Sequence, residues 1–308
     1  MQLDSSKTVD PFGEVNVFPE ADGTVRVKAT ILMRPQVEGA QTGLAIDGSN
    51  SMNQMFGASG AVSALFASAS NNIVQPVART MAEYLANFDS DGNTTVIYWA
   101  CGIGGGEIEE LGDMNAAKAH SYNFSPPKRP GTGTKLLPAI QYFTETKFPT
   151  APWTIFVFIT DGAIEDLEQV KQYSIQLGQQ IVQGKRKFTK LVLIGLGAHV
   201  DETQMEELDD LDYGGLKDPK GDDIDLWDHK LAASMKKLEE IFAEVVTNEM
   251  ILAPSAIITD SNGKAVRPIG RNSYADGLPA LIEFAMPRAA TSFTITLPDG
   301  KTITQPVT

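Results

Sequence analysis

The chain has 308 residues, of which 42% are hydrophobic and 21% charged, a composition typical of a globular protein with a sizeable core. Its formal net charge of −14 disfavours nucleic acid and anionic membrane surfaces as partners, because both bind proteins mainly through lysine and arginine. The sequence has neither a recognisable secretory signal nor the roughly 18 consecutive apolar residues of a membrane span, so it predicts a cytoplasmic protein.

The first predicted strand lies near the N-terminus. There the run TVRVKATILM at 24–33 largely alternates between apolar and polar residues. Alternation of this kind is typical of a strand with one buried face. Because a lone strand or hairpin is not stable in water, we expect this segment to pair with strands from elsewhere in the chain.

Four continuous apolar runs follow in the middle of the chain. They are TGLAID at 42–47, TTVIYWACG at 94–102, WTIFVFIT at 153–160 and KLVLIGLG at 190–197. Continuous rather than alternating apolar residues are expected of parallel strands that are buried on both faces.

Amphipathic segments alternate with these runs. The sequence predicts helices at 73–88, 135–146, 167–182 and 232–246. The last two carry apolar residues at the i, i+3, i+4 and i+7 spacing, so each should pack one face on the sheet. The alternation predicts an α/β domain over residues 41–248 with a doubly wound, mostly parallel sheet.

The C-terminal segment again predicts short strands. The runs AIITDSNGKAV, ALIEFAM and TSFTITLPDGKTITQPV contain the turn signals Asn262-Gly263 and Asp299-Gly300. We expect residues 1–40 and 249–308 to form together a small β-sandwich, with the α/β domain inserted between its strands.

Three short motifs carry side chains that can bind a metal ion. Asp47, Ser49 and Ser51 lie in DGSNS after the first apolar run, Thr132 lies in GTGT before the second helix, and Asp161 lies in ITDG after the third run. Carboxylates and hydroxyls are the hard oxygen ligands that Mg²⁺ prefers. In a sheet of order 3-2-1-4-5-6, the two aspartates would end the strands between which the order reverses, where ligands bind.

In this order, the motifs resemble the metal-ion-dependent adhesion site of the von Willebrand factor A (vWA) family. The resemblance covers about residues 41–248 and implies a Rossmann-like vWA domain. The ligands that it implies for Mg²⁺ or Mn²⁺ are Asp47, Ser49, Ser51, Thr132 and Asp161. Thr134 is a weaker candidate. The implied function is binding of a partner protein, whose Asp or Glu side chain completes the coordination of the metal ion.

The resemblance leaves a second function open. Cytosolic vWA proteins of the bacterial type resemble accessory subunits of AAA+ ATPases, metal chelatases or tellurite-stress systems, so the chain could be an assembly or regulatory subunit. A Mg²⁺-dependent phosphotransferase is less favoured, because it needs a second aspartate where this chain has Ser49. The sequence also lacks the G-x-S-x-G elbow and the P-loop motif. We therefore predict protein binding rather than an enzyme.

Two segments remain ambiguous. Residues 52–72 are rich in alanine, serine and glycine and include Met55, Phe56, Leu65 and Phe66. They predict either a lid or apolar rim for partner selection, or an extra helical turn packed on the domain. Residues 201–228 contain twelve acidic residues and two lysines, which indicates either a solvated acidic face or a docking surface for a basic partner.

Overall fold

The structure is a computed structural model. It describes residues 7–31, 33, 39–57, 72–186, 188–197, 200–218, 221, 223–232, 251–275 and 277–307. The chain divides into two compact units, one of residues Gly39–Lys236 and one that combines 1–38 with 237–308. The predicted helix at 232–246 lies outside the described residues from 233 onward, and so does the predicted domain boundary at residue 248. Among the described residues, no helix has both the length and the apolar character needed to cross a membrane.

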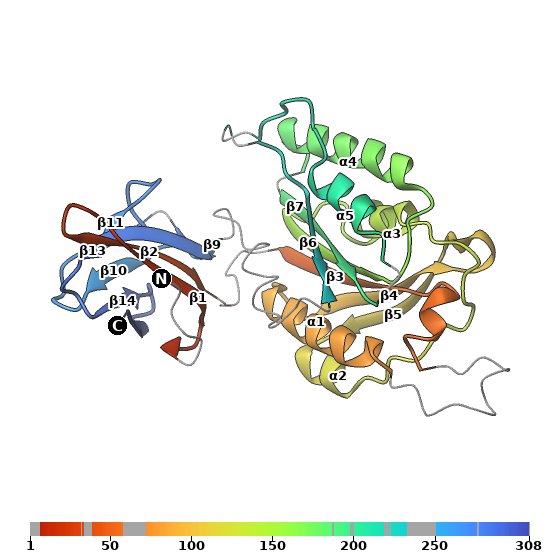
Figure 1. Ribbon diagram of the computed structural model, residues 1–308, viewed down its shortest axis with the longest axis horizontal. Helices are drawn as coiled ribbons and strands as arrows, with labels where there is room; N and C mark the ends of the chain where they lie inside the picture. Colours follow the sequence, from red (N-terminus) through yellow and green to blue (C-terminus); the bar gives the residue numbers. More distant parts are fainter. Residues whose placement is uncertain are drawn as a thin grey trace. The chain divides into compact units, whose positions relative to one another are not determined.

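The larger unit is built around a six-stranded sheet in the order β5-β4-β3-β6-β7-β8 (Figure 1). Its strands are β3 (Ala40–Asp47), β4 (Thr94–Cys101), β5 (Glu107–Met114), β6 (Trp153–Thr160), β7 (Phe188–Gly195) and β8 (Trp227–Leu231). Neighbouring strands are parallel, except that β5 runs antiparallel to β4. Strands β3, β4, β6 and β7 correspond to the four predicted apolar runs, within two residues at each end, and are buried along nearly their whole length.

Helices cover both faces of this sheet (Figure 1). They are α1 (Val74–Phe88) and α2 (Ala116–Ser121) on one face, and α3 (Leu137–Gln141), α4 (Leu167–Val182) and α5 (Glu202–Asp209) on the other. α3 continues into a π-helical turn at Tyr142–Lys147. The ring of Phe143 in this turn stacks on Phe156 of β6, with the ring centroids 4.7 Å apart. It also packs against Gly43 of β3, where a β-carbon would lie 2.5 Å from the ring.

The smaller unit contains three antiparallel sheets. One has the order β1-β2-β13-β11, one the order β10-β14-β15, and β9 pairs with β12. The strands are β1 (Phe12–Pro19), β2 (Thr24–Ile31), β9 (Ile251–Ala253), β10 (Ile257–Asp260), β11 (Arg267–Pro268), β12 (Leu278–Pro279), β13 (Leu281–Pro287), β14 (Ser292–Thr296) and β15 (Thr302–Pro306). Phe12 and Phe284 of the first sheet both pack edge to face on Phe293 of the second.

The predicted fold class is wrong. We expected an α/β protein with a doubly wound, mostly parallel sheet and a small β-sandwich. The described residues instead contain fifteen strands and five α-helices, and three of the four sheets are wholly antiparallel. The fourth sheet is mixed because of β5. The described part of the chain is therefore mostly β. The prediction relied on the long apolar runs, whereas strands as short as β11 and β12 carry almost no periodic signal.

The ambiguous segment at 52–72 is described only in part. Residues 58–71, which include Leu65 and Phe66, lie outside the described residues. Phe56 is buried, and its ring packs edge to face on Tyr98 of β4 with the centroids 5.9 Å apart. Phe56 therefore belongs to the core of the larger unit and does not form an exposed rim.

Part of the acidic segment at 201–228 forms internal ion pairs. The ammonium group of Lys190 is buried and lies 3.1 Å from Asp225 Oδ2 and 3.0 Å from Asp228 Oδ2. Asp209 lies 3.0 Å from Nδ1 of His229. These carboxylates help to hold β8 to β7 and α5 to β8, so the segment is more than a solvated face.

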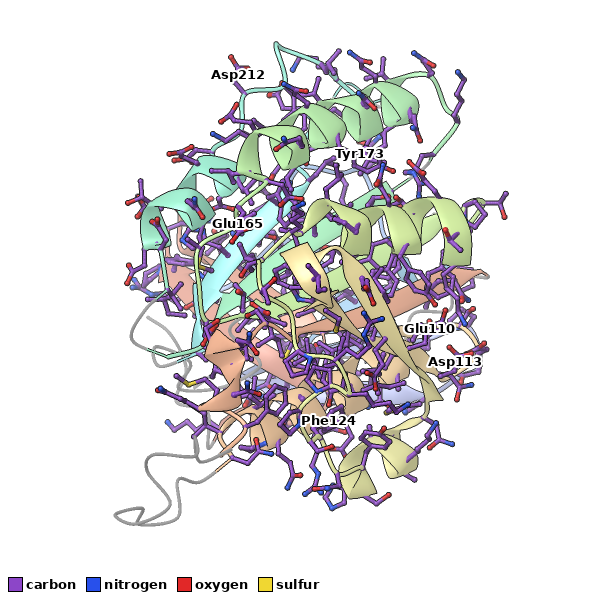
Figure 2. The ribbon with its side chains drawn as sticks, turned by 90° about the vertical axis from the view of Figure 1, so that its right-hand side faces the viewer. Glu110, Asp113, Phe124, Glu165, Tyr173 and Asp212 are labelled. Atoms are coloured by element: carbon purple, nitrogen blue, oxygen red, sulfur yellow. The ribbon has the colours of Figure 1, made fainter. Side chains whose placement is uncertain are left out.

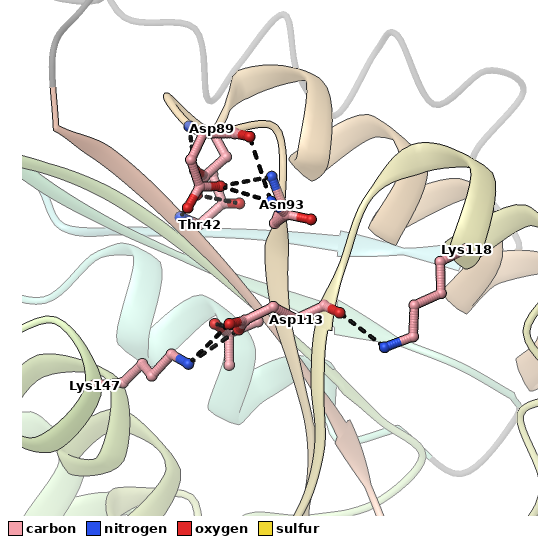
Figure 3. Close-up of polar contacts among 8 residues, drawn as sticks. Thr42, Asp89, Asn93, Asp113, Lys118 and Lys147 are labelled. Carbon is pink, nitrogen blue, oxygen red and sulfur yellow. Dashed lines mark hydrogen bonds and ion pairs between the residues drawn. The ribbon is translucent and has the colours of Figure 1, made fainter.

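Edge strand β5 is held by polar contacts. Asp113 accepts a hydrogen bond from Thr95 of β4 at 2.6 Å and pairs with Lys147 at 3.0 Å, and its carbonyl accepts from Lys118 (Figure 3). Charged side chains on an edge strand also oppose unwanted pairing with another chain. Asp113 therefore ties β5 to its neighbouring elements.

A buried carboxylate joins α1 to the start of β3. Asp89 follows α1 and has no exposed surface. Its Oδ2 accepts hydrogen bonds from the backbone nitrogen of Thr42 at 2.7 Å and from the Thr42 hydroxyl at 3.2 Å (Figure 3). Its Oδ1 accepts from the backbone nitrogen of Asp91 at 3.1 Å. Burial nevertheless raises the pKa of Asp89 to about 7.

We predict that Asp89→Asn reduces the pH dependence of stability between about pH 4 and pH 7. A carboxyl group whose pKa is raised in the folded state contributes its stability in full below its unfolded pKa, near 4, and loses it as the pH rises through 7. Asparagine cannot ionise, so the variant should lose less stability over this range. Urea denaturation at a series of pH values measures the effect. Asp299→Asn, an exposed carboxylate in a turn, is the control, and an unchanged pH profile for Asp89→Asn would contradict the prediction.

Candidate metal centre

The three predicted motifs meet at the carboxyl end of the six-stranded sheet. Asp47 is the last residue of β3, and Asp161 directly follows β6, the neighbouring strand. The strand order reverses between β3 and β6, because β4 and β5 lie on one side and β7 and β8 on the other. A crevice for ligands is expected outside the carboxyl ends of strands at such a reversal.

The GTGT loop lies directly beside the DGSNS loop. Gly131 forms a parallel bridge with Ser49. The Gly131 carbonyl accepts a hydrogen bond from the backbone nitrogen of Asn50, and its own nitrogen donates to the carbonyl of Gly48, both at 2.9 Å. Two loops that are about 80 residues apart in the chain are thus held together by backbone hydrogen bonds on each side of Ser49.

Four of the five predicted ligands are connected by hydrogen bonds. Asp47 Oδ1 accepts from the backbone nitrogen of Ser49 at 2.7 Å. The hydroxyl oxygens of Ser49 and Ser51 lie 2.9 Å apart. The Ser51 hydroxyl donates to Asp161 Oδ1 at 2.8 Å. The structure therefore brings Asp47, Ser49, Ser51 and Asp161 together from two separate loops.

Thr132 lies beside this group, but its hydroxyl is bonded elsewhere. Its Oγ1 accepts a hydrogen bond from the backbone nitrogen of Gly104 at 2.9 Å, and its own nitrogen donates to the Gly102 carbonyl at 3.1 Å. Thr134, the weaker candidate, is buried, and its carbonyl accepts from the backbone nitrogen of Glu165 at 2.9 Å. The two threonines thus help to connect the GTGT loop to its neighbours.

Glycine allows the loops to approach this closely. A β-carbon at Gly131 would lie 1.7 Å from the carbonyl oxygen of Ala100, and one at Gly48 would lie 2.8 Å from the ring of Pro127. Ala100 itself has a φ of 54°, in the left-handed region that disfavours residues with a β-carbon. It lies where the register of β4 against β5 shifts, between Tyr98 and Cys101. Backbone strain of this kind often occurs at functional sites.

The electrostatics of the site centre on Asp47. Its burial raises the pKa of its carboxyl group to about 6, although hydrogen bonds from Thr160 and Ser49 act in the opposite direction. The nearby carboxylate of Asp161 raises this pKa further. A cation between the two aspartates would favour the ionised form of both.

The donor set fits a hard divalent cation. The site offers two carboxylates and the hydroxyls of Ser49 and Ser51, with Thr132 adjacent. Such oxygen ligands suit Mg²⁺ or Mn²⁺ rather than softer metals. In the described part of the chain, no group of three or more His, Cys, Asp or Glu side chains could hold a metal ion. A metal ion here would therefore depend on hydroxyl oxygens for part of its coordination.

The sequence analysis missed two residues at this site. Thr160 donates a hydrogen bond to Asp47 Oδ2 at 2.6 Å and so orients the buried carboxylate. Its position directly before Asp161, at the end of a predicted strand, was the available signal. The exposed carboxylate of Glu165, a residue labelled in Figure 2, lies against Gly133, where a β-carbon would be 2.6 Å from Glu165 Oε2. No sequence pattern pointed to Glu165.

Comparisons with known proteins give no family. No family model matches the chain, and no curated protein matches it. Among solved structures, it is similar to the pilus adhesin SpaC from Lactobacillus rhamnosus GG, with a TM-score of 0.42 and 10% sequence identity. The match covers 96% of this chain and 48% of the adhesin, so the chain spans about half of the adhesin's length. A likeness this low carries no argument about function.

We predict that Thr160→Val destabilises the protein by about 1–3 kcal/mol, the usual cost of leaving a buried polar group without its hydrogen bond. Valine keeps the shape of threonine but removes the hydroxyl that donates to Asp47. Thr160→Ser retains the hydroxyl and serves as the control. The measurement is the free energy of unfolding in urea without added metal. Equal values for the two variants would show that this hydrogen bond does not stabilise the site.

Proposed function

We propose that the protein binds one divalent cation, Mg²⁺ or Mn²⁺, and uses it to bind an acidic side chain of a partner protein. The proposed ligands are Asp47, Ser49, Ser51, Thr132 and Asp161. The observation that carries the proposal is the chain of hydrogen bonds from Asp47 through the two serines to Asp161. The three motifs also resemble the metal-ion-dependent adhesion site of the vWA family. This resemblance of the motifs, and not the fold class, supports the proposal.

The chemistry of the ligands favours binding of a further carboxylate. The site supplies at most two negative charges, and both oxygens of Asp47 already accept hydrogen bonds from the protein. Mg²⁺ requires about six oxygen ligands in octahedral geometry. Hydroxyl groups fill coordination positions without neutralising charge. An Asp or Glu side chain from the partner would fill a coordination position that the protein's own ligands leave open.

The exposure of the ligands indicates the side of approach. Asp47 has no exposed surface, and Ser49 and Asp161 are nearly buried. Ser51 is exposed. A cation held among them would lie close to the surface on the side of Ser51. We therefore propose that the partner's carboxylate binds from this side, and that the ion serves recognition rather than catalysis.

We predict that Asp161→Asn weakens Mn²⁺ binding by at least about tenfold, because the variant loses half of the negative charge at the site. Electron paramagnetic resonance of free Mn²⁺ measures the affinity, and Mg²⁺ should compete. Asp212→Asn is a matched control, because Asp212 is an exposed aspartate of the acidic segment that is visible in Figure 2. Equal Mn²⁺ binding by wild type and both variants would show that Asp161 is not a ligand, and would reject the proposal.

We predict that Ser51→Ala abolishes metal-dependent partner binding, because the Ser51 hydroxyl lies between Ser49 and Asp161. The variant should remain folded, because Ser51 is exposed. The immobilised chain should retain a partner in Mg²⁺ and release it in EDTA. Ser121→Ala, on the exposed surface of α2, is the control.

The same pull-down separates the two functions that the sequence left open. A Mg²⁺-dependent partner that is an ATPase would favour an assembly or regulatory subunit, and another partner would favour simple recognition. A partner that remains bound in EDTA, or that binds Ser51→Ala as well as wild type, would contradict the proposed mechanism.

A further inference from the structure

A large apolar side chain is held in solvent next to Thr132. Ile103 is 88% exposed, whereas the other exposed large hydrophobic residues in the described part of the chain reach at most 62%, at Ile257. Ile103 lies in the glycine-rich loop between β4 and β5. Single apolar residues on a surface are common, so exposure alone has no functional meaning.

The loop around Ile103 is fixed by hydrogen bonds. The backbone nitrogen of Gly102 donates to the carbonyl of Arg129 at 2.9 Å, and that of Gly105 donates to the carbonyl of Gly102 at 3.2 Å. A β-carbon at Gly105 would lie 1.9 Å from the carbonyl oxygen of Gly133, so the two loops are in backbone contact. The exposure of Ile103 is therefore imposed by a well-connected loop.

One of these hydrogen bonds connects the loop to the candidate metal centre. Gly104, the residue after Ile103, donates its backbone nitrogen to Thr132 Oγ1 at 2.9 Å. Because the Cα atom of Ile103 is two covalent bonds from that nitrogen, it lies within about 5 Å of the Thr132 hydroxyl. If an acidic residue of a partner binds an ion at this site, the residues next to it in the partner's sequence lie within reach of Ile103.

The surroundings of Ile103 leave room for a partner. Positions at Gly104 and Gly106 have nothing within 4 Å of an added β-carbon, so a second backbone can approach there. The nearby cations are paired with glutamates, Arg129 with Glu107 at 2.7 Å and Lys128 with Glu109 at 3.7 Å. The exposed carboxylate of Glu165 lies near the same loops, against Gly133. An apolar contact is therefore available at Ile103 beside the charged groups of this edge.

We propose that Ile103 is a specificity-determining contact of the candidate metal centre. It selects partners that carry an apolar side chain within one or two residues of the acidic residue that binds the ion. The inference rests on the proposed function and deepens it. Contact between two apolar side chains removes both from water, and this contribution is lost when the neighbouring residue of the partner is polar.

The test compares two peptides on the full chain saturated with Mn²⁺. The peptides GLELG and GSESG share the central glutamate and differ only in its neighbours. Isothermal titration should show that wild type binds GLELG about tenfold more tightly than GSESG. Ile103→Ser should remove this preference and leave Mn²⁺ affinity within about twofold of wild type. Ile257→Ser, which removes an exposed isoleucine from β10, should keep the preference.

The outcomes distinguish this inference from the proposed function. If both peptides bind wild type equally and both are released by EDTA, the role of Ile103 is overturned while the proposed function stands. If Ile103→Ser loses Mn²⁺ binding, the loop acts through Thr132 and not by contact, which also overturns the inference. If wild type binds no Mn²⁺, or neither peptide binds in an EDTA-sensitive way, both proposals are overturned.

Discussion

The candidate metal centre depends on one buried carboxylate. Asp47 ends a central strand, has no exposed surface, and accepts hydrogen bonds from Ser49 and Thr160. Burying a carboxylate costs free energy unless hydrogen bonds and an opposite charge compensate for it. Burial raises the pKa of Asp47 to about 6 despite these hydrogen bonds, and the nearby carboxylate of Asp161 raises it further. A divalent cation would supply the positive charge that favours the ionised form of both carboxyl groups.

The backbone around this carboxylate is arranged by close contacts that only small residues allow. Gly48 and Gly131 leave no space for a β-carbon, and Ala100 adopts a left-handed conformation at the irregular end of β4. Bulges of this type bend a strand and redirect the segment that follows it. Here the redirected segment is the glycine-rich loop that carries Ile103 to the side of Thr132. The conformation of β4 therefore helps to place Ile103 next to Thr132.

The sequence predicted the buried elements of the larger unit well and the fold class wrongly. The four apolar runs are strands and α4 spans the predicted residues 167–182, because burial on both faces or on one helical face leaves a strong periodic signal. The direction of β5 and the three antiparallel sheets depend on pairing between distant segments, which leaves little trace in any one of them. At the site, the motifs identified the loops, but they did not reveal that Thr160 orients Asp47 or that Glu165 lies against Gly133.

The hydroxyl of Thr132 connects the two proposals in physical terms. A hydroxyl oxygen has two lone pairs, and Gly104 occupies one of them as a hydrogen-bond donor. The other lone pair can bind an ion, and the donated hydrogen bond restricts the rotation of the side chain while it does so. The position of the Thr132 oxygen is therefore linked to the position of the loop that carries Ile103. A partner that contacts Ile103 would stabilise this loop, and through Gly104 it would also stabilise the side chain of Thr132, the proposed ligand. The loop that carries Ile103 and the loop that carries Thr132 would then favour two contacts in the same arrangement. One is the contact with the partner's apolar side chain, and the other is coordination of the partner's acidic residue by the ion.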